Sequence, residues 1–172
     1  MLFRSRASWD AAQLKAAEGF VQHWQIIGPF FGADRKKISL DLPTELETEY
    51  LKSAKVDLSK SIGDMQWKPA TADRKTGFVN LARDLAAAEF CVAFAYAELT
   101  SETDRHVLLR CGSDDGIRIY LNGLQIHKHE IGRGYKPYSD QVNVVLKKGI
   151  NTLLVKCDNY HGAWGFGVHV PR

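Results

Sequence analysis

The chain has 172 residues, of which 45% are hydrophobic and 25% charged, so it can bury the core of one folded domain. Its 23 basic and 20 acidic residues leave a formal net charge of +3. These charges are spread along the chain, which argues against a nucleic acid or an anionic membrane as partner. The longest uncharged apolar run, residues 90–97, is too short to span a bilayer, and three cysteines cannot complete a disulfide framework.

The N-terminal stretch predicts one helix and no signal peptide. The basic residues of the first six positions are not followed by an apolar stretch, as a signal peptide requires. Ser8 is a suitable N-cap, and the apolar positions after it have helical spacing until Gly19. We therefore expect residues 1–19 to form a helical extension and residues 20–172 to form a β-sandwich module.

The next segments predict a strand, a short helix and a long irregular stretch. Residues 20–27 alternate like a half-buried strand and stop at a Gly-Pro pair. Thr44 and Glu47 have the spacing of a capping box, which predicts a helix of two or three turns. Residues 57–85 are mostly polar and predict long connections around one or two short strands.

From residue 90 onward, six segments alternate apolar and polar side chains with a period of two. They lie at 90–97, 106–111, 117–121, 142–146, 153–157 and 166–170. Strands of this kind bury one face, and turn residues separate them. The sequence therefore predicts an all-β fold: an antiparallel β-sandwich of the jelly-roll type with a short N-terminal helix.

Chain direction sorts the connections between these strands into two ends. The Asn-Gly pair at 122–123 is typical of a tight hairpin, and residues 147–151 predict a similar turn. Consecutive antiparallel strands alternate in direction. The longer connections at 111–116, 130–141 and 158–165 are therefore expected to meet at the opposite end.

These longer connections carry aromatic rings beside planar hydrogen-bonding groups. The apolar face of a sugar stacks on Trp or Tyr, and its hydroxyls bind carboxylate, amide and guanidinium groups. We therefore predict that this end binds a carbohydrate. The predicted ligand-binding residues are Asp114, Asp115, Arg133, Tyr135, Tyr138, Asn159, Tyr160, His161 and Trp164. Replacing Trp164 by alanine is then expected to weaken glycan binding without unfolding the domain.

Some of these residues also have an ordinary structural interpretation. Asp114 and Asp115 could bind calcium, since hard cations take clustered carboxylate oxygens. The alternative is a turn in which the two aspartates cap their own backbone amides and Gly116 supplies a positive φ, and we favour that interpretation. Trp164 could equally fill the core, where Trp24 and Trp67 are expected to lie.

The histidines and cysteines of these strands form no recognisable metal or catalytic motif. His127 and His129 lie two residues apart on one face of a strand, as two metal ligands could. No third ligand follows at a diagnostic spacing, so a metal role for them is disfavoured. Cys91, Cys111 and Cys157 lie in strand patterns and are expected to be buried and structural.

Four stretches of the sequence resemble the galactose-binding-like jelly-roll modules. They begin at Trp24, Phe94, Cys111 and Leu146 and read WQIIGPF, FAYA, CGSDDGIRIYLNG and LKKGINTLLVK. The central stretch is also similar to the sugar-binding domain of family-2 glycoside hydrolases and, more distantly, to the protective-antigen-type lectin domain. The resemblance covers about residues 24–170.

The resemblance implies a non-catalytic accessory module, found beside catalytic domains in large polysaccharide-processing or surface proteins. It implies a polysaccharide or glycan and the neighbouring domains of the parent chain as partners, and an extracellular or periplasmic location. In the lectin-like relatives an Asp-Asp pair holds calcium that a sugar coordinates. Asp114 and Asp115 match that pair, so calcium is the one cofactor that the resemblance implies. A chain that stops two residues after its last predicted strand is expected to be part of a longer protein.

Two other functions stay open. The module could be a structural spacer or docking domain without a ligand, in which case the aromatic loop residues should pack against the domain itself. A hydrolase could use Asp114, Asp140 or Asp158. No spaced acid and base pair, nucleophile motif or metal signature accompanies these aspartates, so we do not expect an enzyme.

Overall fold

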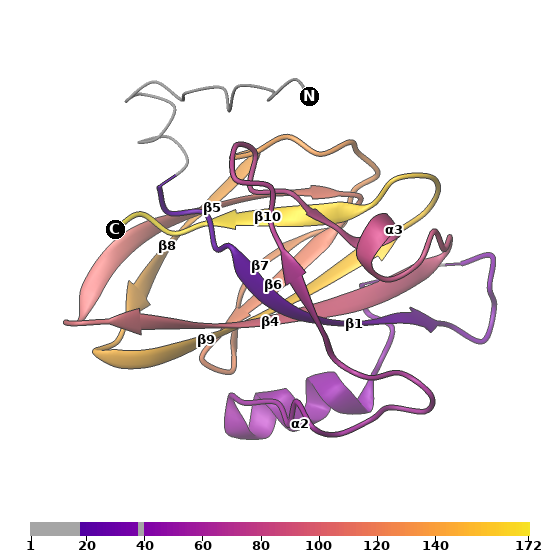
Figure 1. Cartoon of the computed structure of the whole chain (residues 1–172), viewed down its shortest axis with the longest axis horizontal. Coiled ribbons are helices and arrows are strands. Elements are labelled where there is room, and N and C mark those ends of the chain that lie inside the picture. Colours follow the sequence, from indigo (N-terminus) through magenta and orange to yellow (C-terminus); the bar gives the residue numbers. More distant parts are fainter. Residues whose placement is uncertain (1–17, 38–39) are drawn as a thin grey trace, which may run out of the picture.

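The computed structural model describes residues 18–37 and 40–172, which form two antiparallel sheets packed face to face (Figure 1). The larger sheet contains, in spatial order, β2 (Lys68–Thr71), β1 (His23–Phe31), β4 (Cys91–Ser101), β9 (Gly149–Asn159), β6 (Ile117–Leu121) and β7 (Leu124–His129). The smaller contains β3 (Val79–Asn80), β10 (Gly165–His169), β5 (Arg105–Asp114) and β8 (Asp140–Leu146). The expected antiparallel β-sandwich is confirmed. The helix expected before Gly19 lies almost wholly outside the described residues.

Within the described residues two short helices accompany the sheets, α2 (Glu45–Ser53) and α3 (Leu81–Asp84). Helix α2 begins as the capping box predicts, because the Thr44 hydroxyl accepts a hydrogen bond from the Glu47 amide at 3.2 Å. It ends where Ala54 adopts a left-handed conformation. In the part of the chain that the structure describes, no helix is long and apolar enough to cross a membrane.

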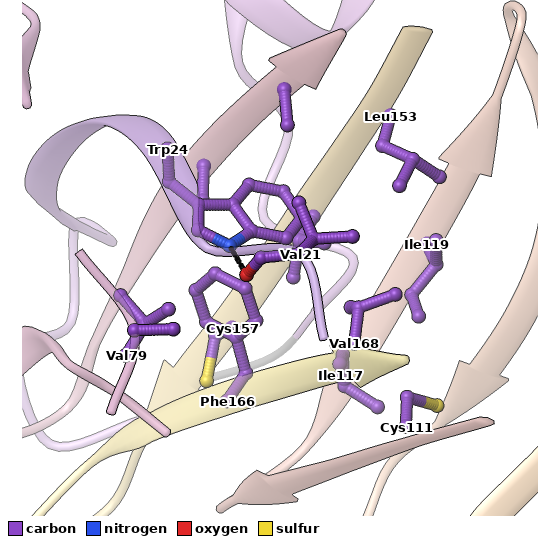
Figure 2. Packing of buried hydrophobic residues seen from close by; sticks show 14 of the residues in the cluster. Val21, Trp24, Val79, Cys111, Ile117, Ile119, Leu153, Cys157, Phe166 and Val168 are labelled. Carbon is purple, nitrogen blue, oxygen red and sulfur yellow. Dashed lines mark hydrogen bonds between the residues drawn. The ribbon is translucent and has the colours of Figure 1, made fainter. Parts of the chain in front are cut away.

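The core between the sheets consists of the apolar side chains that strand alternation turns inward (Figure 2). At its centre the ring of Trp24 meets that of Phe166 edge-on, with centroids 5.0 Å apart. The Trp24 indole N–H donates to the Val21 carbonyl at 2.9 Å, so its polar atom is satisfied inside the core. The three cysteines are free and buried, as expected.

The outer face of the larger sheet is covered by α2, which lies on the side away from the smaller sheet (Figure 1). Leu46 and Tyr50 of the helix pack there against aromatic side chains of the sheet. The buried Glu47 carboxylate accepts from Lys156 Nζ at 2.7 Å and from the Arg118 guanidinium at 3.0 Å. Charges removed from water need such partners, so this group fixes where the helix sits on the sheet.

The first strand differs from its prediction. The alternation predicts a strand over residues 20–27, but β1 begins at His23 and continues past Gly28-Pro29 to Phe31. A register shift between Ile27 and Phe30 takes up the proline, which has no amide hydrogen for the ladder. Gly28 is required here, because a Cβ at this position would lie 3.0 Å from the Cβ of Ala93 and its φ is +145°.

Trp164 belongs to the core. Its side chain is 0% exposed, and its indole N–H donates to the carbonyl of Ala86 at 3.0 Å. Of the two interpretations of this residue, the structure supports the core one. Trp164 therefore lies away from the surface predicted to bind a glycan, and we expect Trp164→Ala to destabilise the fold.

We predict that Trp164→Ala lowers the free energy of unfolding by about 3–5 kcal/mol, because it removes a buried indole and leaves a cavity. Urea denaturation followed by circular dichroism measures the change. Leu124→Ala is the matched control, since Leu124 is 71% exposed and its loss should cost under about 0.5 kcal/mol. A loss for Trp164→Ala as small as that of the control would contradict the burial.

Candidate functional site

The carboxylate of Asp115 joins three connections at one end of the sandwich. Its Oδ1 accepts a hydrogen bond from the amide of Arg133 at 3.0 Å, and its Oδ2 accepts one from the amide of Tyr160 at 2.8 Å. The connections after β5, β7 and β9 therefore lie side by side, as chain direction predicts. Each bond is assisted by the carboxylate charge, which makes it stronger than a bond between neutral groups.

The tight turns lie together at the opposite end. Asn122 and Gly123 have φ angles of +50° and +81°, the conformation of the expected hairpin. The Asn122 side chain donates to Asn151 Oδ1 at 2.9 Å and accepts from the Thr152 amide at 2.8 Å. The two ends differ as predicted for the connections after β7 and β9, which are longer than these turns. The connection between β5 and β6 is shorter than predicted, since it consists of Asp115 and Gly116 alone.

Asp158 lies buried beneath the end where these connections meet and binds the backbone of one of them. Its side chain is fully buried, and Oδ1 accepts from the Gly116 amide at 2.7 Å. Its Oδ2 is buried without a hydrogen-bond partner among the described residues. Burial raises the pKa of this carboxyl to about 6, because desolvation penalises the charged form.

Asp114 lies at the surface of the same end. It is half-buried, and burial followed by the neighbouring Asp115 carboxylate raises its pKa to about 6. A carboxyl of this kind carries a proton for part of the time near neutral pH. It can then donate to a ligand hydroxyl as well as accept from one.

Among the described residues, no third acidic, histidine or cysteine side chain joins Asp114 and Asp115 in one compact group of ligands. Both oxygens of Asp115 accept backbone amides, but these belong to Arg133 and Tyr160 in other connections, so the expectation that the aspartates cap the amides of their own turn is wrong for Asp115. Calcium takes six to eight oxygen ligands. Among residues 18–37 and 40–172, one set of three or more acidic, histidine or cysteine side chains brings its ligand atoms within 4.8 Å of one another: Cys111, His127 and Asp140.

The expected surface of four rings does not form. Trp164 fills the core, and Tyr135 packs on Phe78 with ring centroids 4.6 Å apart. Tyr138 stays 39% exposed, but it stacks on Phe20 with ring centroids 5.4 Å apart and lies beside His169 of β10, which leaves Tyr160 as the remaining ring of the predicted four at this end. We therefore correct the expectation that Tyr135, Tyr138 and Trp164 share one surface with Tyr160.

The physical reason is that the connection between β7 and β8 lies flat against the smaller sheet. A Cβ on Gly112 would lie 2.0 Å from the Lys136 carbonyl oxygen, and one on Gly167 would lie 2.1 Å from the Tyr135 hydroxyl oxygen. These two glycines provide the room for the connection. Glycines within β5 and β10 were the sequence signal for this close approach.

Beside the predicted His161, the rim of this end includes Glu89 and Phe90, which the sequence analysis did not assign to the site. His161 is exposed, its ring lies edge-on to that of Phe90 at 4.7 Å, and its Nδ1 lies 3.2 Å from a Glu89 carboxylate oxygen. The buried Asn159 side chain holds this segment by donating to the Ala88 carbonyl at 2.7 Å. The alternation predicts a strand that includes Phe90, but the φ of this residue is +52°, so it belongs to the turn before β4.

Arg133 is engaged within the protein. Its guanidinium donates to Asp140 Oδ2 at 2.6 Å, to Asp140 Oδ1 at 3.1 Å and to Ser113 Oγ at 2.9 Å. These bonds hold the pKa of Asp140 well below its usual range despite its burial. Of the predicted ligand-binding residues, those at the open rim are Asp114, Tyr160 and His161.

Comparison with known proteins finds no matching sequence family and no matching curated protein. Among solved structures, a family 35 carbohydrate-binding module from an environmental isolate is 14% identical, with a TM-score of 0.38 over 46% of this chain and 66% of that one. The PA14 sugar-binding domain from an RTX adhesin is 16% identical, with a TM-score of 0.36 over 46% of each chain.

Faecalibacterium prausnitzii β-glucuronidase is 17% identical, with a TM-score of 0.46 over 82% of this chain and 21% of that one. The chain spans less than two thirds of the length of each of these three proteins. Likeness at this level is a distant similarity of fold alone.

We predict that Asp115→Asn lowers the free energy of unfolding by about 2–3 kcal/mol. The amide keeps one acceptor but turns an N–H toward a backbone N–H, so one charge-assisted bond is lost and a buried donor is left unpaired. Urea denaturation at pH 7 measures this. The neighbouring variant Asp114→Asn should lose much less, and equal losses would show that Asp115 does not hold the connections.

Asp158 predicts a pH dependence of stability. Its pKa is about 6 in the folded protein, against 3.8 for an aspartate in water, so on raising the pH the unfolded chain loses this proton first. The contribution of Asp158 to stability is therefore present below pH 4 and is lost as the pH rises to 6, by about 3 kcal/mol.

Asp158→Asn should remove this loss, so that the difference in unfolding free energy between variant and wild type changes by about 3 kcal/mol between pH 4 and pH 7, in favour of the variant at pH 7. Thermal unfolding across this range measures it. Asp64→Asn, at an exposed turn, is the control. A constant difference for Asp158→Asn would rule out the raised pKa.

Proposed function

We propose that this protein is a non-catalytic carbohydrate-binding module of a larger polysaccharide-processing or surface protein. Its ligand is held at the end of the sandwich where Asp115 joins three connections. The proposal is supported by the resemblance of the four sequence stretches to galactose-binding-like modules and by the chemistry of the rim. Ligand sites carried on loops of a rigid scaffold are common.

The observation that carries the proposal is the combination of Asp114 with Tyr160 and His161 on a fixed backbone. The half-buried Asp114 carboxyl, with its pKa of about 6, can both donate to and accept from sugar hydroxyls. The rings of Tyr160 and His161 offer faces for the C–H surface of a sugar. Because Asp115 already holds the Tyr160 amide, little conformational entropy remains to be lost on binding.

The aspartates do not support a hydrolase. Glycoside hydrolysis needs two carboxyl groups that both face the scissile bond. Asp158 is fully buried, and Asp140 is bound by Arg133 and two histidines. Asp114 is then the only one of the three candidate aspartates at the rim, which favours binding over catalysis.

A structural spacer or docking domain is the second candidate. It is favoured by Trp164 and Tyr135, whose rings pack against the domain itself as this function requires. The two candidates differ in one outcome, since a spacer has no glycan ligand.

A glycan array followed by calorimetric titration of the best ligand tests the proposal. We expect Tyr160→Ala and Asp114→Asn to weaken binding about 10- to 100-fold, the range for losing one central contact. Leu124→Ala, at the opposite end, should bind as the wild type does. Calcium chelation with EGTA shows whether an ion bridges Asp114 and the sugar, as the lectin resemblance implies.

The absence of any glycan ligand would favour the spacer. Binding that survives both rim variants would place the ligand elsewhere on the domain. Turnover of a polysaccharide that Asp114→Asn abolishes would instead make the protein a hydrolase.

A further inference from the structure

Polar side chains line the interior where β7 of the larger sheet faces β8 of the smaller one. His127 and His129 pair across the ladder with Ile119 and Ile117, so they point into the space between the sheets as these isoleucines do. On the smaller sheet Asp140 pairs with Cys111, and these two side chains share the inward face. An edge that could be closed by apolar packing thus brings together a thiol, two imidazoles and a carboxylate.

The atoms of this cluster are close. Asp140 Oδ2 lies 3.2 Å from His127 Nε2, and Asp140 Oδ1 lies 3.0 Å from His129 Nδ1. The Cys111 sulfur, a ring nitrogen of His127 and a carboxylate oxygen of Asp140 all lie within 4.8 Å of one another. Ligands of a tetrahedral zinc ion are about 3–4 Å apart, given metal–ligand bonds of about 2.0–2.3 Å. A contraction of about 1 Å therefore places the three atoms around one ion.

We propose that Cys111, His127 and Asp140 bind a divalent transition metal ion of the zinc type. A thiolate, an imidazole and a carboxylate form a ligand set that zinc accepts and that calcium and magnesium do not prefer. His129 holds the second oxygen of Asp140 and orients that ligand, as outer-shell partners do at metal sites. Water fills the fourth position.

The guanidinium of Arg133 supplies the positive charge beside Asp140 in this structure. It forms two bonds to Asp140, yet its Nε is buried without a partner in the described part of the chain. The guanidinium also donates to Ser113 Oγ at 2.9 Å, so an ion can bind only when the arginine side chain leaves Asp140 and Ser113. When the ion binds, the Cys111 thiol releases its proton to solvent, and thiolate and carboxylate together balance the two positive charges.

A purely structural ion pair between Arg133 and Asp140 makes the opposite prediction for one variant. If the arginine competes with the ion, Arg133→Gln should bind metal more tightly than the wild type. If the cluster only stabilises the fold, Arg133→Gln removes the arginine partner of the Asp140 carboxylate, leaves its contacts to His127 and His129, and creates no metal site that includes the sulfur of Cys111.

The test titrates the tag-free chain with Co²⁺, a spectroscopic substitute for zinc. We expect one ion per chain, a sulfur-to-cobalt charge-transfer band in the near ultraviolet and the visible bands of tetrahedral cobalt. Cys111→Ser should abolish the charge-transfer band and Cys91→Ser should keep it. His127→Gln should weaken binding at least 10- to 100-fold, while the exposed His106→Gln should not change it.

Arg133→Gln should raise the Co²⁺ affinity about tenfold and keep the charge-transfer band, with competition by Zn²⁺ reporting the zinc affinity. A wild-type chain without the charge-transfer band overturns the proposal, as does a band that persists in Cys111→Ser. Unchanged or weaker binding by Arg133→Gln also overturns it. The wild-type spectrum and Arg133→Gln decide the question even where Cys111→Ser or His127→Gln fails to fold.

Discussion

The end of the sandwich where the connections after β5, β7 and β9 meet depends on the carboxylate of Asp115. Three connections that are 18 to 45 residues apart in sequence are joined by the two oxygens of one side chain, each bonded to a different backbone amide. Either backbone amide would lose its hydrogen bond if its connection moved away. The Asp115 carboxylate therefore fixes the backbone positions of Asp114 and Tyr160. The candidate sugar site is fixed by backbone contacts, with only a few side chains left for recognition.

The outer faces of the two sheets explain why so few aromatic rings remain at that end. On the larger sheet α2 is held by the buried pair of Glu47 and Lys156, and its apolar side chains cover the strands. On the smaller sheet the connection between β7 and β8 lies against Gly112 and Gly167 and carries Tyr135 onto Phe78. Rings that the sequence suggested for ligand stacking therefore contribute to folding, since burying an aromatic surface stabilises the protein more than leaving it in water.

At the edge between β7 and β8, polar side chains occupy inward positions that apolar side chains could fill. The inward positions of Cys111 and Asp140 keep the alternation of a buried strand, but the residues placed there are polar. A buried carboxylate needs a cation, and either the Arg133 guanidinium or a metal ion can provide it. Arg133 therefore links two places. Its guanidinium binds Asp140 between the sheets, and its backbone amide donates to Asp115 at the end of the sandwich.

Local patterns in the sequence determined the strands from Cys91 onward, the helix start at Thr44, the hairpin at Asn122 and the grouping of connections at two ends. Period-two alternation indicates which side chains share a face of a strand. Antiparallel pairing indicates which connections lie at the same end of the sandwich. Only the tertiary structure decided where Trp164 points and that His127 meets Cys111 and Asp140. Cys111, His127 and Asp140 come from three strands of two sheets. Spacing along the chain does not encode how the inner faces of two sheets are placed against each other.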